Sequence, residues 1–199
     1  MAVMCHRSLF ERCECRNGVH LRMYTPIYDS HTHYQSFDLF GFNEEKCFKQ
    51  LDDSTIRQLI MINNNHKYYL WSNVRSCFSK NTKIYNTYGI HPKYIPENNI
   101  SFHLDKLEEI ILKEKESRHI VAIGECGIDE TSRFPFEVQL NVFEAQVTLA
   151  NKFHLPLILH GRGLRAYENM YSVLEKQLNI NNPVQWHCVN SKLESTRIK

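Results

Sequence analysis

The sequence predicts an α/β protein of the (β/α)8 TIM-barrel type, with only about six strand–helix units present. Short apolar strands alternate with longer amphipathic stretches from Pro26 onward, the pattern of parallel βαβ units. Candidate metal ligands follow several of these strands. A barrel gathers such groups from many strand ends on one rim, whereas an open sheet concentrates them at a switch point. The ligands therefore favour a barrel, although a complete one needs about 250 residues and this chain has 199.

Composition and charge narrow the class of protein. Hydrophobic residues make up 42% and charged residues 23% of the chain, as in ordinary globular proteins. A net charge of +2 argues against a nucleic-acid coat or a membrane-surface protein, and no apolar run approaches the length of a membrane span. The seven cysteines lack a framework spacing, so we expect reduced thiols. Eleven histidines point to metal chemistry.

The chain divides into two expected regions. Residues 1–24 are predicted to form a loose leader, and residues 25–199 a partial barrel domain. The leader carries arginines but no apolar stretch of the kind that a secretory signal needs. Glu11 and Glu14 argue against a mitochondrial targeting segment, which remains the weaker alternative to a cytoplasmic or nuclear location.

The first half of the predicted barrel rests on short β-rich segments. Proline stops regular pairing, so the third strand is expected to end at His91-Pro92. Strands and helical stretches are expected in the order Ile27 to His31 (strand), Glu44 to Leu51 (helix), Ile56 to Ile62 (strand), His66 to Phe78 (helix) and Lys83 to Ile90 (strand). Ser101 is the expected cap of the next helix, where Leu104, Leu107 and Ile111 recur three and four apart.

The pattern is clearer in the second half. His119 to Gly124 is apolar on both faces, as a buried parallel strand should be. Apolar residues from Phe136 to Ala150 then recur at helical steps. The remaining elements are a strand at Pro156 to Leu159, a helix over Tyr167 to Leu174 and a strand at Pro183 to Trp186.

Candidate ligands stand where these strands end. His31 and His33 are two residues apart, so in extended chain both imidazoles face one side, and Asp29 lies on that side as a candidate partner of an imidazole. Glu125, His160 and His187 each follow a different strand. Taken singly, each has an ordinary structural explanation, such as a salt bridge or a buried histidine. The joint pattern favours metal binding.

Other residues receive no site role at this stage. Tyr68, Tyr69 and Trp71 could stack on bases, but packing against the barrel is the favoured interpretation. Six histidines have no expected strand-end placement and are assigned nothing: His6, His20, His66, His103, His119 and His154.

Five blocks of sequence together resemble the TatD-type metal-dependent deoxyribonucleases, which are amidohydrolase-like barrels. The central block, Val121 to Asp129 (VAIGECGID), is close to that family's V-A-I-G-E-x-G-L-D signature. The other blocks are Asp29 to His33 (D-x-H-x-H), Gly89 to Pro92 (G-[IV]-H-P), Phe143 to Arg162 (a helix followed by L-P-x-x-x-H-x-R) and His187-Cys188 (H-C).

The resemblance implies roles for these residues. His31 and His33 would bind a first divalent ion and Glu125 would bridge to a second, with Mg, Mn or Zn as options. His160 and His187 would complete the second ion's shell. His91 and Arg162 would contact the substrate phosphate or support the site. The implied reaction is hydrolysis of DNA phosphodiester bonds, typically from the 3′ end.

The chain departs from the family pattern at three points. Glu130 stands where an aromatic residue is usual, and Val189-Asn190-Ser191 replaces F-[ST]-G. The family's last metal-site aspartate ends the eighth strand, which the six predicted strands do not reach. A catalytically inactive shortened product that keeps the ligands is therefore the alternative. A different amidohydrolase chemistry is weaker, because it would favour a lysine where Glu125 stands.

Two consequences are expected if six strands stand alone. The first and last would leave unpaired edges, which predicts self-association. Without the final aspartate, DNA cleavage is expected to be at least about 10²-fold slower than in a complete relative.

Overall fold

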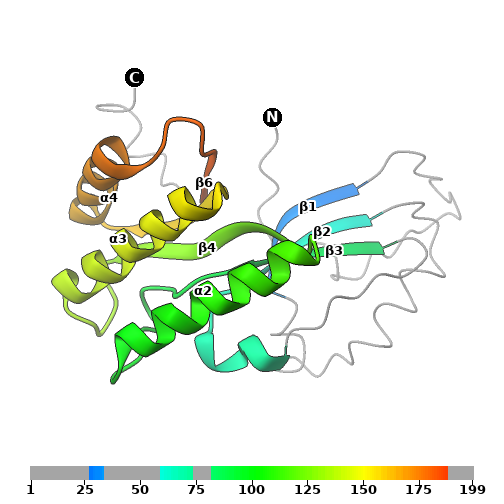
Figure 1. Cartoon of the computed structure of the whole chain (residues 1–199). Helices are drawn as coiled ribbons and strands as arrows, with labels where there is room; N and C mark the ends of the chain where they lie inside the picture. The colour runs from blue at the N-terminus through cyan, green and yellow to red at the C-terminus, as the bar shows by residue number, and fades with distance from the viewer. Residues whose placement is uncertain (1–26, 34–58, 74–81, 188–199) are drawn as a thin grey trace, which may run out of the picture.

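Six parallel strands form one sheet whose spatial order follows the order of the sequence (Figure 1). The computed structural model describes residues 27–33, 59–73 and 82–187. The strands are β1 (Ile27–Thr32), β2 (Leu59–Asn65), β3 (Thr82–Tyr88), β4 (Ile120–Asp129), β5 (Leu157–Arg162) and β6 (Val184–His187). Because the order of the described strands never reverses, this part of the sheet has no topological switch point. The expected partial (β/α)8 barrel is confirmed, with six of its strands.

The sheet is rolled, so that its first and last strands approach each other. The Nε2 atom of Gln185 in β6 lies 3.2 Å from the Oγ atom of Ser30 in β1. The rings of His31 and His187 stack, with 3.7 Å between their centroids. Residues more than 150 positions apart in the chain therefore come together across the partial barrel.

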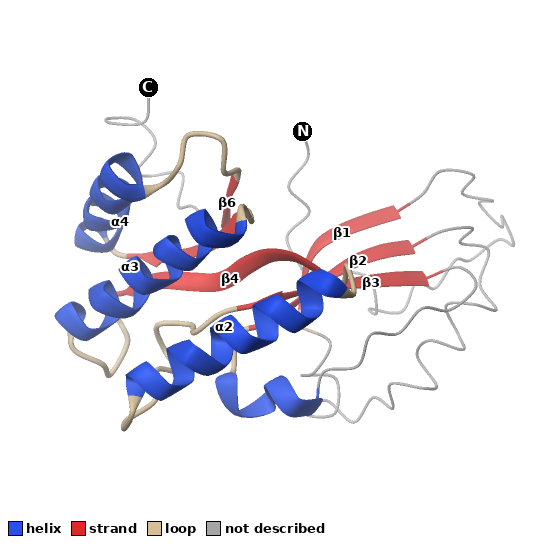
Figure 2. Ribbon diagram, viewed as in Figure 1, coloured by secondary structure: helices blue, strands red, loops and turns tan. Residues whose placement is uncertain are grey.

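Among the described residues, three α-helices cover the outer face of the sheet, as Figure 2 shows most clearly for the helices in front of β4. They are α2 (Ile100–Glu116), α3 (Phe136–Phe153) and α4 (Leu164–Gln177), and a short 3-10 helix, η2 (Tyr68–Asn73), follows β2. Leu107, Phe143 and Met170, one from each α-helix, are fully buried in the core. No helix in the described part of the chain combines the length and hydrophobicity needed to cross a membrane.

The second strand lies three residues later than predicted. It runs from Leu59 to Asn65 instead of Ile56 to Ile62, because it continues through three consecutive asparagines. These side chains are buried but satisfied: Asn63 donates to Asn65 at 2.9 Å and to Asn86 of β3 at 3.1 Å. In the following stretch, predicted as a helix from His66 to Phe78, the described residues form η2 alone.

The fourth and fifth strands are longer than predicted. β4 passes through Glu125 to Asp129, and β5 passes through His160 to Arg162, so both candidate ligands lie within strands. Gly124 is needed for this path. Its φ is +143°, and a Cβ there would lie 2.4 Å from the carbonyl oxygen of Ile158.

Smaller differences concern helix ends and aromatics. Helix α2 begins at Ile100, one residue before the predicted Ser101 cap, and Asn99 precedes it without a side-chain cap. Trp71 is buried, as the packing interpretation predicts, whereas Tyr69 is exposed. The predicted leader and the helix over Glu44 to Leu51 lie outside the described residues.

Candidate metal centre

Glu125 is the centre of the site, with only 3% of its surface exposed. Its Oε2 atom lies 3.6 Å from Nε2 of His31 and 3.6 Å from Nε2 of His33. Those two nitrogens are themselves 3.0 Å apart. On the other side, Oε1 lies 3.1 Å from Nδ1 of His160. The two oxygens of one carboxylate therefore face histidines from β1 and from β5.

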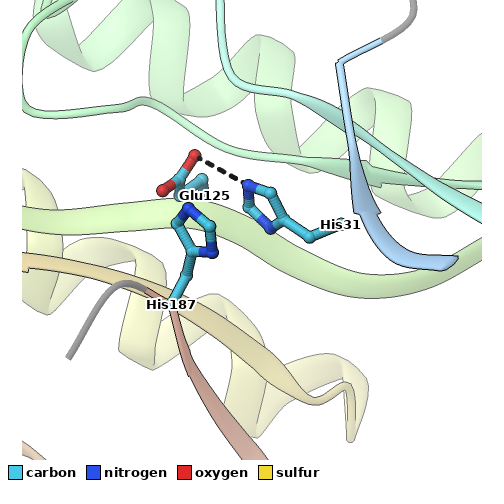
Figure 3. Close-up of side chains that lie close together, drawn as sticks. All are labelled: His31, Glu125 and His187. Atoms are coloured by element: carbon cyan, nitrogen blue, oxygen red, sulfur yellow. Dashed lines mark ion pairs between the residues drawn. The ribbon is translucent and has the colours of Figure 1, made fainter. Parts of the chain in front are cut away.

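His187, the last residue of β6, completes this side of the site. Figure 3 shows its ring beside that of His31, with Glu125 facing both. The resemblance implies that His187 shares an ion with His160, and in the structure its ring stacks on His31 within a group that also contains Glu125.

Three groups of potential ligand atoms share the same carboxylate. Within each group the ligand atoms lie within 4.8 Å of one another: His31, Glu125 and His187; His33, His66 and Glu125; His91, Glu125 and His160. Imidazole nitrogens and a carboxylate are ligands that divalent metals accept, and only the carboxylate has two oxygens with which to span two ions. The donor set therefore fits a metal centre built around Glu125.

Glu125 is ionised despite its burial. Burial alone would raise the pKa of the carboxyl group. The hydrogen bond with His160 and the neighbouring His91 and His31 outweigh that effect and hold the pKa well below its usual range. The group is thus a carboxylate at neutral pH.

His33 is oriented by the main chain of β2. Its Nδ1 atom lies 3.1 Å from the carbonyl oxygen of Asn64, which can only accept a hydrogen bond. Nδ1 of His33 therefore carries the proton, and Nε2 keeps the lone pair that faces Glu125.

His160 is held between two carboxylates. Its Nδ1 atom faces Glu125, and its Nε2 atom lies 3.0 Å from Oδ2 of Asp129. Burial lowers the pKa of His160, but the bonds to Glu125 and Asp129 outweigh it and leave the pKa raised. A carboxylate on the far nitrogen fixes a ligand histidine's tautomer and ring orientation.

Asp129 thus has a function that the sequence did not reveal. It is fully buried, and its Oδ1 atom accepts bonds from the amide and the hydroxyl of Thr131 at 2.8 and 2.6 Å. The Nζ atom of Lys93 lies 3.3 Å from Oδ2. Burial raises the pKa of Asp129, but the bonds from Thr131 and His160 outweigh it and lower the pKa to about 2.

His91 differs from the other histidines in its tautomer. Its Nδ1 atom accepts a hydrogen bond from the backbone amide of Lys93 at 3.0 Å, so Nε2 carries the proton of the neutral ring. Burial, the largest influence, lowers the pKa of His91 to about 2. The ring thus offers an N–H donor, beside His160 at a centroid distance of 4.3 Å.

Arg162 lies at the edge of this arrangement. It ends β5, two residues beyond His160, and pairs in register with Asp129. Its side chain is exposed and belongs to none of the three ligand groups among the described residues.

Helix α3 fixes the backbone on which these side chains stand. The side-chain amide of Gln146 accepts from the amide of Ile90 at 2.8 Å and donates to its carbonyl at 3.1 Å, directly before His91. Gln139 accepts from the amide of Asp129 at 2.8 Å. Two buried glutamines on one helix therefore hold the ends of β3 and β4.

Comparison with known proteins identifies the family of this chain. A family model described as TatD related DNase matches residues 28–198. The chain belongs to the TatD-related DNase family. The relatives that it resembles include the 3′-5′ ssDNA/RNA exonuclease TatD of Erwinia amylovora, 29% identical over 143 residues, which cover 70% of this chain and 47% of that protein. The deoxyribonuclease Tat-D of Schizosaccharomyces pombe is 36% identical over 103 residues, 46% of this chain and 31% of that one.

Solved TatD-family structures share the fold. The TatD homologue YjjV of Escherichia coli superposes with a TM-score of 0.55 at 25% identity, covering 76% of this chain and 56% of that one. A TatD-like protein of Archaeoglobus fulgidus gives a TM-score of 0.55 at 22% identity, covering 83% and 70%. The matches span about half or less of the length of the curated relatives.

Proposed function

We propose that this TatD-family chain is a metal-dependent deoxyribonuclease that hydrolyses phosphodiester bonds of DNA from the 3′ end. The observation that carries the proposal is the buried, ionised Glu125, whose two oxygens face histidines of opposite strands. Membership of a family described as DNases, and relatives named as exonucleases, support the choice of substrate.

The proposal assigns two divalent ions, of Mg, Mn or Zn, to the three groups around Glu125. His31 and His33 would hold one ion, Glu125 would bridge, and His160 would hold the other. His187, stacked on His31, would supply a further nitrogen. A pair of ions at such a site activates water and neutralises the charge that develops on the oxygens of the phosphodiester.

Other side chains of the protein would bind the substrate and orient the ligands. His91 would donate its Nε2–H to a phosphate oxygen, because its Nδ1 already accepts the amide of Lys93. Arg162, exposed at the end of β5, would bind phosphates of the DNA backbone. Asp129 is hydrogen-bonded to His160 and Thr131. It would therefore orient His160 as a metal ligand instead of taking the proton of the attacking water.

The test is strand shortening from a known end. A single DNA strand labelled at its 3′ end is incubated with the chain and Mg²⁺, Mn²⁺ or Zn²⁺, beside a strand labelled at its 5′ end. We expect early release of the 3′ label as a mononucleotide and a ladder from the 5′ label. Glu125→Gln should abolish both, while Glu116→Gln, on the exposed end of α2, should abolish neither.

Two results would contradict the proposal. Cleavage that survives Glu125→Gln would place the activity elsewhere or in a contaminant. Metal binding with no cleavage of DNA would favour the inactive form that keeps its ligands.

A further inference from the structure

His66 has no role in the motifs of the sequence, yet it lies inside the metal centre. It follows Asn65, the last residue of β2, and its ring centroid is 4.4 Å from that of His33. One of its nitrogens lies within 4.8 Å of the ligand atoms of His33 and Glu125. The sequence predicts that β2 ends at Ile62, so His66 has no expected strand-end placement.

The position of His66 is fixed by the main chain around it. The indole nitrogen of Trp71 donates to the carbonyl of Asn65 at 2.8 Å, and the amide of His91 donates to the carbonyl of His66 at 3.4 Å. Trp71 is buried in the core. The turn that carries His66 is therefore tied both to η2 and to the end of β3.

One carbonyl group orients two imidazoles. The carbonyl oxygen of Asn64 lies 3.1 Å from Nδ1 of His33 and 3.3 Å from Nδ1 of His66. Because a carbonyl only accepts, both Nδ1 atoms carry a proton, and both rings keep their lone pair on Nε2. This is the arrangement of ligand histidines, whose far nitrogen is held by a main-chain carbonyl.

We propose that His66 is a metal ligand of this chain, which binds a divalent ion together with His33 and Glu125. A further imidazole makes this part of the centre rich in nitrogen. Imidazole suits zinc and its neighbours, whereas magnesium prefers oxygen ligands. The group of His33, His66 and Glu125 should therefore select Zn²⁺ or Co²⁺ over Mg²⁺. The inference rests on the metal centre proposed above, and its test is independent of DNA cleavage.

The affinity of the chain for Zn²⁺ tests the proposal directly. Apo protein is titrated with ZnCl2 against a chromophoric chelator for wild type, His66→Asn and the matched control His154→Asn. His154 is exposed at the end of α3 in a left-handed conformation that asparagine tolerates. Loss of a mere partner of a ligand weakens metal binding about 10–100-fold. We therefore expect at least a tenfold weaker affinity in His66→Asn and no change in His154→Asn.

A second measurement needs no variant and so does not depend on folding of a mutant. Long-range ¹H–¹⁵N correlation of the histidine side chains of the wild-type chain reports each ring nitrogen. Addition of one or two equivalents of ZnCl2 should move the Nε2 resonance of His66 out of the unprotonated range, as for His33.

The outcomes separate this inference from the proposed function. If Zn²⁺ binds tightly but His66→Asn has wild-type affinity and the His66 resonance is unmoved, His66 is a packing residue and the inference is wrong. If no ion binds to wild type at all, the metal centre and the proposed function fail together.

Discussion

At the scale of single residues, the site depends on how each imidazole is turned. The carbonyl of Asn64 holds His33, the amide of Lys93 holds His91, and the carboxylate of Asp129 holds His160. The first leaves a lone pair facing Glu125 and the second leaves a proton, whereas the ring of His160 is held between the carboxylates of Glu125 and Asp129. One residue type thus supplies both candidate ligands and a candidate donor.

Asp129→Asn should weaken metal binding about 10–100-fold, because an asparagine has only one side-chain oxygen. That oxygen cannot serve both Thr131 and His160, which now bond to different oxygens of the carboxylate. Chelator competition with Zn²⁺ measures the loss. Asp105→Asn, on the exposed face of α2, is the control. Equal affinities in wild type and Asp129→Asn would show that His160 needs no such partner.

At the scale of elements, helix α3 braces the strands that carry the site. Its buried Gln146 satisfies both backbone groups of Ile90. Gln146→Leu would keep the volume but leave that amide and carbonyl without their partner. Each buried group left unsatisfied costs about 1–3 kcal/mol. We expect the free energy of unfolding in urea to fall by that order, with the exposed Gln177→Leu as control. An unchanged midpoint of urea unfolding would mean that the backbone before His91 does not depend on Gln146 for its stability.

The elements also show what could be predicted from the sequence. Apolar runs in the sequence predicted β4 and β5, because the burial pattern of a strand can be seen in its own residues. The spacing of His31 and His33 predicted that their imidazoles converge. The end of β2 was hidden, since three asparagines look like a loop until their side chains are paired with Asn86 across the sheet. His66 was missed for that reason. The function of Asp129 depends on the register of β4 against β5, which no local pattern contains.

At the scale of the whole molecule, the rolled sheet brings β1 and β6 together, and the described residues of these two strands are not paired through their backbones. Side chains beside these edges are exposed, with Tyr28 at 69% and Val184 at 41%. Unpaired edges with apolar neighbours invite pairing between chains.

We therefore expect concentration-dependent association of the 199-residue chain in sedimentation velocity. Tyr28→Lys with Val184→Lys should reduce it, because charge at an edge opposes pairing. Ile180→Lys, in the exposed loop between α4 and β6 and outside both edge strands, should not. A monodisperse wild-type monomer with a cooperative melt would refute the expectation.

The central claim is that Glu125 joins ligands from opposite strands into one metal centre. Elemental analysis of protein dialysed against Mn²⁺ or Zn²⁺ measures it most directly, for wild type, Glu125→Gln and the double variant His31→Ala/His33→Ala. We expect two bound ions in wild type and a clear loss in both variants, with melting curves of the apo proteins as the control for folding. Equal metal content in all three proteins would contradict it.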